Sequence, residues 1–86
     1  MTLSKLKHGD RAIIISIGDD DANSMARLAA RGIVPGTQIG VLQAGDPLLI
    51  GIDNERWALN RFEAATIEVD LLERPRRRLA GLFRRS

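Results

Sequence analysis

Few side chains in this sequence have the types and spacing needed for acid–base, nucleophilic or metal chemistry. His8 is the only histidine, it lies two residues before Asp10, and there is no cysteine. An imidazole beside a carboxylate suits a borderline metal such as zinc or ferrous iron, with further ligands from a second molecule. His8 and Asp10 are therefore a candidate metal pair, and the alternative is a surface histidine without any ligand.

A run of aspartates, Asp19 to Asp21, follows Gly18 and could also be considered for a hard cation. Carboxylate oxygens suit calcium, magnesium or manganese, but consecutive aspartates on a loop point in different directions and the EF-hand ligand spacing is missing. We interpret this segment as a helix-capping loop. Asp21 or Asn23 would accept hydrogen bonds from the first free amides of a helix.

The groups on which most enzymes depend are missing from the sequence. The absence of cysteine removes disulfides, thiolate metal sites and thiol nucleophiles together. Ser16 and Ser24 have no candidate base at a defined spacing, and there is no glycine-rich phosphate loop for nucleotide hydrolysis. We predict that this chain is not an enzyme.

Length and charge divide the chain into a domain and a tail. Its 86 residues provide one domain with some chain left over. Residues 73–86 hold six arginines and one glutamate and carry +5, so residues 1–72 carry −3. The predicted organisation is a domain at 1–72 and a basic, flexible tail at 73–86, and the basic pI is no sign of a nucleic-acid partner.

No apolar run is long enough for a membrane span or signal peptide, so a cytoplasmic location is expected.

The tail has a pattern of its own. Its apolar residues fall at i, i+3 and i+4 and are flanked by arginines; these residues are Arg76, Arg77, Arg78, Leu79, Leu82 and Phe83. Folded as a helix, this segment would suit an anionic membrane surface or an acidic partner. The alternative is a disordered basic tail that aids solubility.

Hydrophobic periodicity predicts a mostly β fold with one short helix after the first strand. Expected strands lie at 11–17, 37–44, 48–52, 56–59 and 66–71, with the helix at 24–31 and single helical turns at 3–6 and 60–65. The isoleucine run in the first strand indicates burial on both faces or a bent strand. One helix provides too few crossovers for a parallel sheet, so a five-stranded antiparallel barrel is favoured.

Two local features complete this prediction. The helix should bury a stripe of Met25, Leu28 and Ala29. Of the domain's two aromatic residues, Trp57 and Phe62, one or both should belong to the core.

The segment between the helix and the second strand predicts a sharp corner. Gly32 can adopt the left-handed conformation that ends a helix, and Pro35-Gly36 fits the central positions of a type II turn. This corner would let Leu28, Ile33 and Ile39 share one core.

Four segments, in order from about Leu3 to Leu71, together resemble the FeoA family, the accessory protein of bacterial ferrous iron uptake. They are "LSKLKHGDRAII", "LAARGIVPGTQIGVL", "GDPLLIGID" and "WALNRFEAATIEV". The resemblance implies an SH3-like barrel and a cytosolic protein, at the inner face of the membrane, that works with the transporter FeoB and its GTP-binding domain. The acidic loop at 18–23 and the arginine-rich tail depart from the family pattern.

A GTPase activator often inserts an arginine that stabilises transition-state charge. By position alone, Arg27, Arg31 and Arg61 are candidates for this role, with surface solvation as the alternative, and the tail residues above are further candidates for partner contact.

Small barrels of this kind also occur with three other functions. SH3-like domains of metal-dependent transcriptional repressors act through protein or metal contacts, although no DNA-binding helix pair precedes the domain here. An RNA-binding barrel would depend on the tail alone, and polyproline binding needs a groove with more aromatic residues. A homodimer could form through exposed strand edges.

Overall fold

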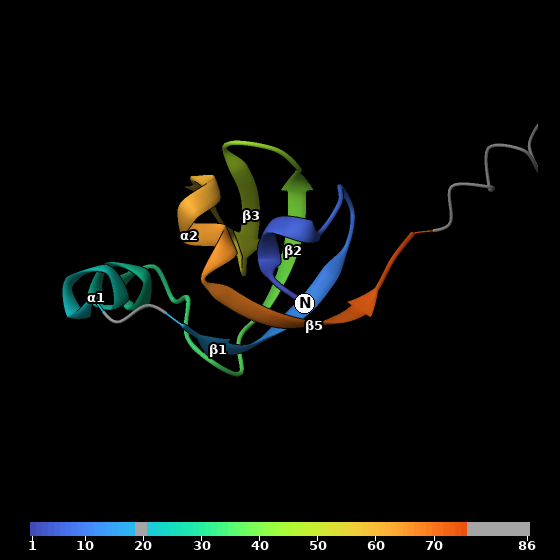
Figure 1. Ribbon diagram of the computed structural model, residues 1–86. Helices are drawn as coiled ribbons and strands as arrows, with labels where there is room; N and C mark the ends of the chain where they lie inside the picture. Colours follow the sequence, from blue (N-terminus) through green and yellow to red (C-terminus); the bar gives the residue numbers. More distant parts are fainter. Residues whose placement is uncertain (19–20, 76–86) are drawn as a thin grey trace, which may run out of the picture.

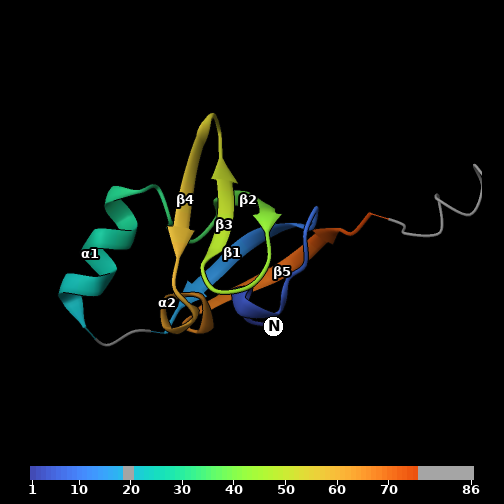
Figure 2. The same cartoon turned by 90° about the horizontal axis from the view of Figure 1, so that it is seen from above.

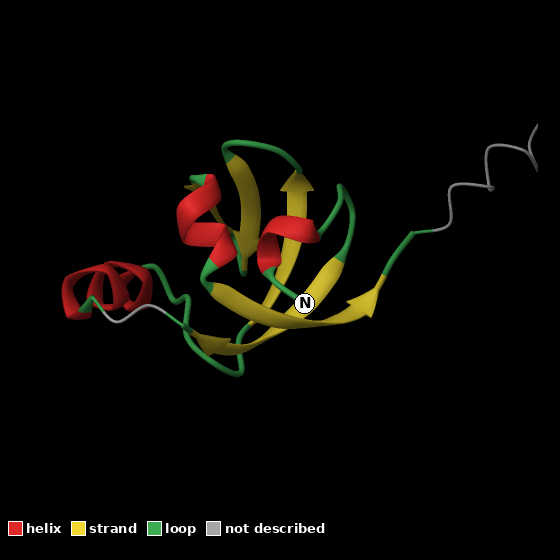
Figure 3. Cartoon of the chain, in the orientation of Figure 1, coloured by secondary structure: helices red, strands yellow, loops and turns green. Residues whose placement is uncertain are grey.

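A computed structural model describes residues 1–18 and 21–75 of the chain. Its elements follow the predicted order (Figures 1 and 3), and they are η1 (Leu3–Lys5), β1 (Arg11–Ile17), α1 (Ala22–Ala30), β2 (Gln38–Gln43), β3 (Leu48–Ile52), β4 (Glu55–Leu59), α2 (Arg61–Ala65) and β5 (Ile67–Glu73). The predicted mostly β architecture, with one helix after the first strand, is confirmed.

All five strands belong to one antiparallel sheet in the order β4-β3-β2-β1-β5. The sheet curls around the core, and β4 and β5 remain its two edges within the described residues (Figure 2). Helix α2 contacts β4, β5 and η1, so it covers the opening between the two edges. The barrel is therefore completed by a helix rather than by a last pair of strands.

The core is aliphatic, as the scarcity of aromatic residues requires. Inward positions alternate along β3, where the first, third and fifth residues are buried. The predicted burial of Leu28, Ile33 and Ile39 in one core is confirmed. The full cluster is Leu3, Leu6, Ala12, Ile14, Leu28, Ile33, Ile39, Val41, Leu48, Ile50, Ile52, Leu59, Ala64, Ile67 and Val69.

Strand β1 is irregular rather than buried on both faces. Ile14 is buried but Ile15 is 48% exposed, and the pairing with β5 shifts register between Ile14 and Ser16. Of the two alternatives for the isoleucine run, burial on both faces is wrong, and a bulged strand explains the pattern.

Helix α1 starts two residues earlier than expected and buries less than expected. Asp21 is its N-cap, with the side chain accepting from the Asn23 backbone N–H at 3.0 Å. Of the predicted stripe only Leu28 is buried, whereas Met25 is 40% exposed and Ala29 is exposed too. The reason is visible in Figures 1 and 2, where α1 projects from one end of the barrel instead of lying across it. None of the described helices has the length and apolarity to cross a membrane.

The corner after α1 has the predicted geometry. Gly32 has φ +82° and Gly36 has φ +93°. The Thr37 backbone N–H donates to the Val34 carbonyl at 3.1 Å, which closes the turn around Pro35-Gly36. A positive φ at the third position of a hydrogen-bonded turn that follows proline is the mark of type II.

Replacing Gly36 with alanine should lower the free energy of unfolding by about 1–3 kcal/mol, because an L side chain is strained at this φ. A Cβ at Gly36 would have no neighbour within 4 Å, so crowding does not contribute. Gly40→Ala is the matched control, since its Cβ would also be in open space and its φ is not positive. Equal urea unfolding midpoints for the two variants would contradict the turn assignment.

Candidate functional site

Helix α2 is short and depends on a capping box at its first turn. The Asn60 side chain accepts from the Glu63 backbone N–H at 2.8 Å, and the Glu63 carboxylate accepts from the Asn60 backbone N–H at 3.1 Å. The Thr66 hydroxyl donates to the Glu63 carbonyl at 2.8 Å at the other end of the helix. These bonds satisfy amides and carbonyls that a five-residue helix cannot satisfy internally.

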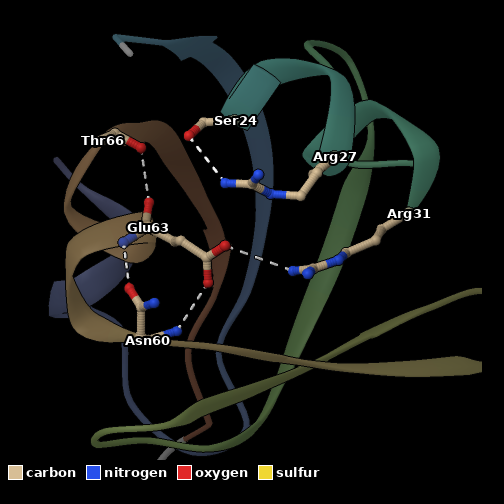
Figure 4. A network of polar contacts seen from close by, with 6 residues as sticks. All are labelled: Ser24, Arg27, Arg31, Asn60, Glu63 and Thr66. Atoms are coloured by element: carbon tan, nitrogen blue, oxygen red, sulfur yellow. Dashed lines mark hydrogen bonds and ion pairs between the residues drawn. The ribbon is translucent and has the colours of Figure 1, made fainter. Parts of the chain in front are cut away.

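The same glutamate also connects α2 to α1. Its second carboxylate oxygen lies 3.7 Å from the Arg31 Nη1 atom at the end of α1 (Figure 4). The Arg31 guanidinium also lies over the Trp57 ring of β4, 5.8 Å from the ring centroid. Arg31 Nη1 is buried and makes no hydrogen bond within the described part of the chain. Arg31 is therefore held between an anion and an aromatic face.

Arg27 differs from Arg31 in being accessible. Both side chains extend from α1 toward α2 in Figure 4, but Arg27 is exposed, and within the described residues its guanidinium donates a 3.3 Å hydrogen bond from Nη2 to the Ser24 hydroxyl. Within residues 1–18 and 21–75, Arg27 makes no ion pair. Its charge is available to an incoming group.

The sequence predicts that Trp57, Phe62 or both belong to the core, and Phe62 is instead the most exposed large apolar side chain described. It is 70% exposed, and the Arg61 guanidinium lies 5.1 Å from its ring centroid. Trp57, by contrast, is half-buried and packs against the core. Because residues two apart face opposite sides of a helix, the burial of Ala64 turns Phe62 outward.

A hollow of about 470 Å³ lies beside Arg27, Phe62 and Glu63 at one end of the barrel. Its lining combines the two helices with the end of β1, and consists of Gly18, Ser24, Arg27, Asn60, Phe62, Glu63 and Thr66. We call the exposed residues Arg27, Arg61 and Phe62 the α1–α2 surface. The fold thus brings the three predicted arginines to the two helices at this end, with Arg31 half-buried in a supporting contact. Phe62 and Glu63 were not predicted from the sequence to belong to this site. Two signals were available: Phe62 lies two positions before the buried Ala64, and Asn60 and Glu63 have the N-x-x-E spacing of a capping box.

The predicted metal pair is at the other end of β1, and its carboxylate is already engaged. Asp10 is fully buried. The Arg74 guanidinium donates to both carboxylate oxygens, at 3.0 Å from Nε to Oδ1 and 2.8 Å from Nη2 to Oδ2, and the Lys7 backbone N–H donates at 2.8 Å. His8 is exposed.

This donor set does not fit a metal ion, since the Asp10 oxygens would first have to lose Arg74. No group of three or more His, Asp or Glu side chains suited to a metal occurs in the described ranges. Binding of iron or zinc at His8 and Asp10 stays a prediction that this geometry does not support.

The folded part of the chain extends slightly beyond the predicted boundary at residue 72. Strand β5 ends at Glu73, Arg74 binds Asp10, and Pro75 packs on Gly9, where an added Cβ would be only 2.8 Å from the proline ring. Several residues of the sequence predictions lie outside the described residues, namely Asp19, Asp20, Arg76, Arg77, Arg78, Leu79, Leu82 and Phe83.

Comparison with known proteins places this architecture in a family. The family model of the FeoA domain matches residues 1–71, and the chain therefore belongs to the FeoA family, which is related to ferrous iron transport. Among curated proteins, none matches the chain significantly.

Solved structures of family members share the fold. FeoA of Stenotrophomonas maltophilia, complexed with zinc, is 34% identical, with 81% of this chain and 89% of that chain covered and a TM-score of 0.71. That protein is described as a prokaryotic SH3-domain protein. FeoA of Chlorobium tepidum is 32% identical, with 90% and 75% covered and a TM-score of 0.77. The predicted SH3-like class is confirmed by these similarities.

A manganese-dependent transcriptional repressor is also similar, with 24% identity, 83% of this chain and 40% of that chain covered, and a TM-score of 0.78. At this level of identity the likeness shows the fold alone.

The Asp10–Arg74 pair predicts a specific pH dependence of stability. Hydrogen bonding from Arg74 lowers the pKa of Asp10 below its ordinary 3.8, against the opposing effect of burial. A carboxyl whose pKa is lower in the folded state stabilises the fold above the unfolded pKa, and this contribution is lost as pH falls through the folded pKa. Asp10→Asn should therefore be less stable than the wild type at neutral pH, with the difference shrinking in acid.

Urea unfolding between about pH 7 and pH 2 measures this difference. Asp70→Asn, which changes an exposed aspartate on β5, is the matched control and should follow the wild-type curve. A constant difference between the Asp10→Asn and wild-type curves across this range would show that the ion pair does not stabilise the fold.

Proposed function

We propose that this protein is a non-catalytic accessory protein of bacterial ferrous iron uptake that binds the transporter FeoB, on its cytoplasmic side, through the α1–α2 surface. Family membership supports the iron-uptake role. The observation that carries the choice of surface is Phe62, an aromatic side chain left 70% exposed beside arginines on two different helices.

The composition of this surface is that of a protein-binding anchor. Aromatic residues and arginine are enriched where binding energy concentrates in interfaces. Burying an apolar side chain of this size contributes roughly 1.5–3 kcal/mol, so the exposure of Phe62 leaves binding energy unused in the free protein. The adjoining hollow, whose lining apart from the ring is mostly polar, would accept a polar side chain of the partner beside the ring.

The three arginines that are candidates for stimulating a GTPase differ in their contacts. Arg31 is committed to Glu63 and Trp57, and its removal would leave Glu63 without its cation. Arg61 lies against Phe62 at the start of α2. Arg27 is the accessible cation, so within this proposal it is the residue that would reach a nucleotide-bound partner.

Binding can be tested with the full chain by pull-down against the detergent-solubilised transporter and its isolated GTP-binding domain. Phe62→Ala should weaken binding by about tenfold or more, because a buried aromatic anchor contributes upwards of 1.5 kcal/mol. Leu42→Ala, which removes a 42% exposed apolar side chain on β2, is the matched control and should bind as the wild type does. Equal affinities for the two variants would exclude the α1–α2 surface.

GTP turnover by the transporter tests the regulatory part separately. Turnover should rise on addition of the wild-type protein, and most of this rise should be absent with Arg27→Ala. With Phe62→Ala the full rise in turnover should return when the protein concentration is increased. Unchanged turnover with saturating wild-type protein would remove the activator role and leave a scaffold.

A further inference from the structure

The end of the barrel opposite α1 carries a second feature, which the proposed transporter contact does not use. Figures 1 and 2 show the end of β5 leaving the barrel on the side away from α1. We propose that this end is a docking surface for anionic lipid headgroups, with Lys7 as its principal cation.

The surface is built around a hollow of about 340 Å³ between the N-terminal loop and the end of β5. Its lining residues come from chain segments more than 60 positions apart, and they are Lys7, His8, Gly9, Asp10, Arg74 and Pro75. The Asp10–Arg74 ion pair and the packing of Pro75 on Gly9 hold the two segments together. The hollow is thus a fixed part of the fold.

The charge at this hollow is positive. The carboxylate of Asp10 is fully buried and its charge is matched by Arg74, which still exposes 43% of its side chain. Lys7 is exposed and makes no ion pair with any described residue. Because Asp10, the one acidic residue among those that line the hollow, is neutralised by Arg74, the Lys7 ammonium can attract an external anion.

The sequence adds positive charge after these residues. Pro75 lines the hollow, and the next three residues along the chain are Arg76, Arg77 and Arg78, which lie outside the described residues. Apolar residues accompany the charges, since Leu72 is 50% exposed on β5. Cations interspersed with apolar side chains match a surface of anionic headgroups over hydrocarbon. The opposite end differs, because Glu63 pairs with Arg31 there and Asp21 accepts from the same Ser24 hydroxyl that Arg27 contacts.

Co-sedimentation of the full chain with vesicles tests the proposal, with phosphatidylcholine vesicles compared with vesicles containing phosphatidylglycerol. The wild type should bind the anionic vesicles more tightly. Lys7→Ala should bind them about fivefold more weakly, which corresponds to the roughly 1 kcal/mol that one lysine contributes near an anionic surface. The backbone N–H that Lys7 donates to Asp10 is retained in this variant, and Lys7→Gln serves as a second replacement.

Arg56→Ala is the matched control because it removes one exposed positive charge elsewhere. The register places Arg56 opposite Gly51, Gly51 opposite Gly40, and Gly40 opposite Arg11, so Arg56 is three strands away from the start of β1. Three inter-strand steps measure roughly 14 Å along the curled sheet, and Arg56 does not line the hollow. Arg56→Ala should change vesicle affinity less than twofold.

Equal losses in the Lys7 and Arg56 variants would mean that only net charge matters, and they would overturn the proposal. Equal binding to neutral and anionic vesicles would overturn it as well. These outcomes are independent of the transporter pull-down, so this proposal and the proposed function can fail separately.

Discussion

The arrangement of the two helices depends on the carboxylate of Glu63. One of its oxygens closes the capping box of α2 through the Asn60 N–H, and the other lies near Arg31 at the end of α1. Helix α1 has little else to fix it, because Leu28 is its one buried side chain. A single side chain therefore both starts one helix and holds the end of the other, and Trp57 supports it by lying beneath the arginine.

This constraint explains why the exposed groups at this end are arranged as they are. With Arg31 committed to Glu63, Arg27 one turn earlier remains unpaired within the described residues and faces the same hollow. Because Ala64 faces the core, Phe62 lies on the outside of α2. The aliphatic barrel supplies the rigid support, and the two helices at its end present the groups that can bind a partner.

The opposite end is organised by a different ion pair of the same kind. Arg74 reaches back over 64 positions to Asp10 and ties the end of β5 to the loop before β1. The two ends are thus each fixed by an arginine–carboxylate contact, one partly exposed and one with its carboxylate fully buried. In a small domain with an aliphatic core, these contacts specify where the helices and the end of β5 lie.

Local patterns predicted the elements well, because strands, caps and turns depend on neighbouring residues. The corner at Gly32 and Pro35-Gly36 and the burial of Leu28 followed from spacing alone. The exposure of Phe62 and Met25 did not, since it depends on how each helix meets the barrel. The Asp10–Arg74 pair was also beyond prediction, because nothing local joins residues so far apart. The three candidate arginines were found by position, but their different availability required the tertiary contacts.

The most direct test of the α1–α2 surface is a map of the contact itself. Hydrogen–deuterium exchange, or amide chemical shifts of the labelled protein, can be followed while the cytoplasmic region of the transporter is added. We expect protection or shifts concentrated around Arg27 on α1 and Arg61 and Phe62 on α2, with the outer face of β2 and β3 unchanged. Changes confined to the sheet face, with α1 and α2 unaffected, would contradict binding through the α1–α2 surface.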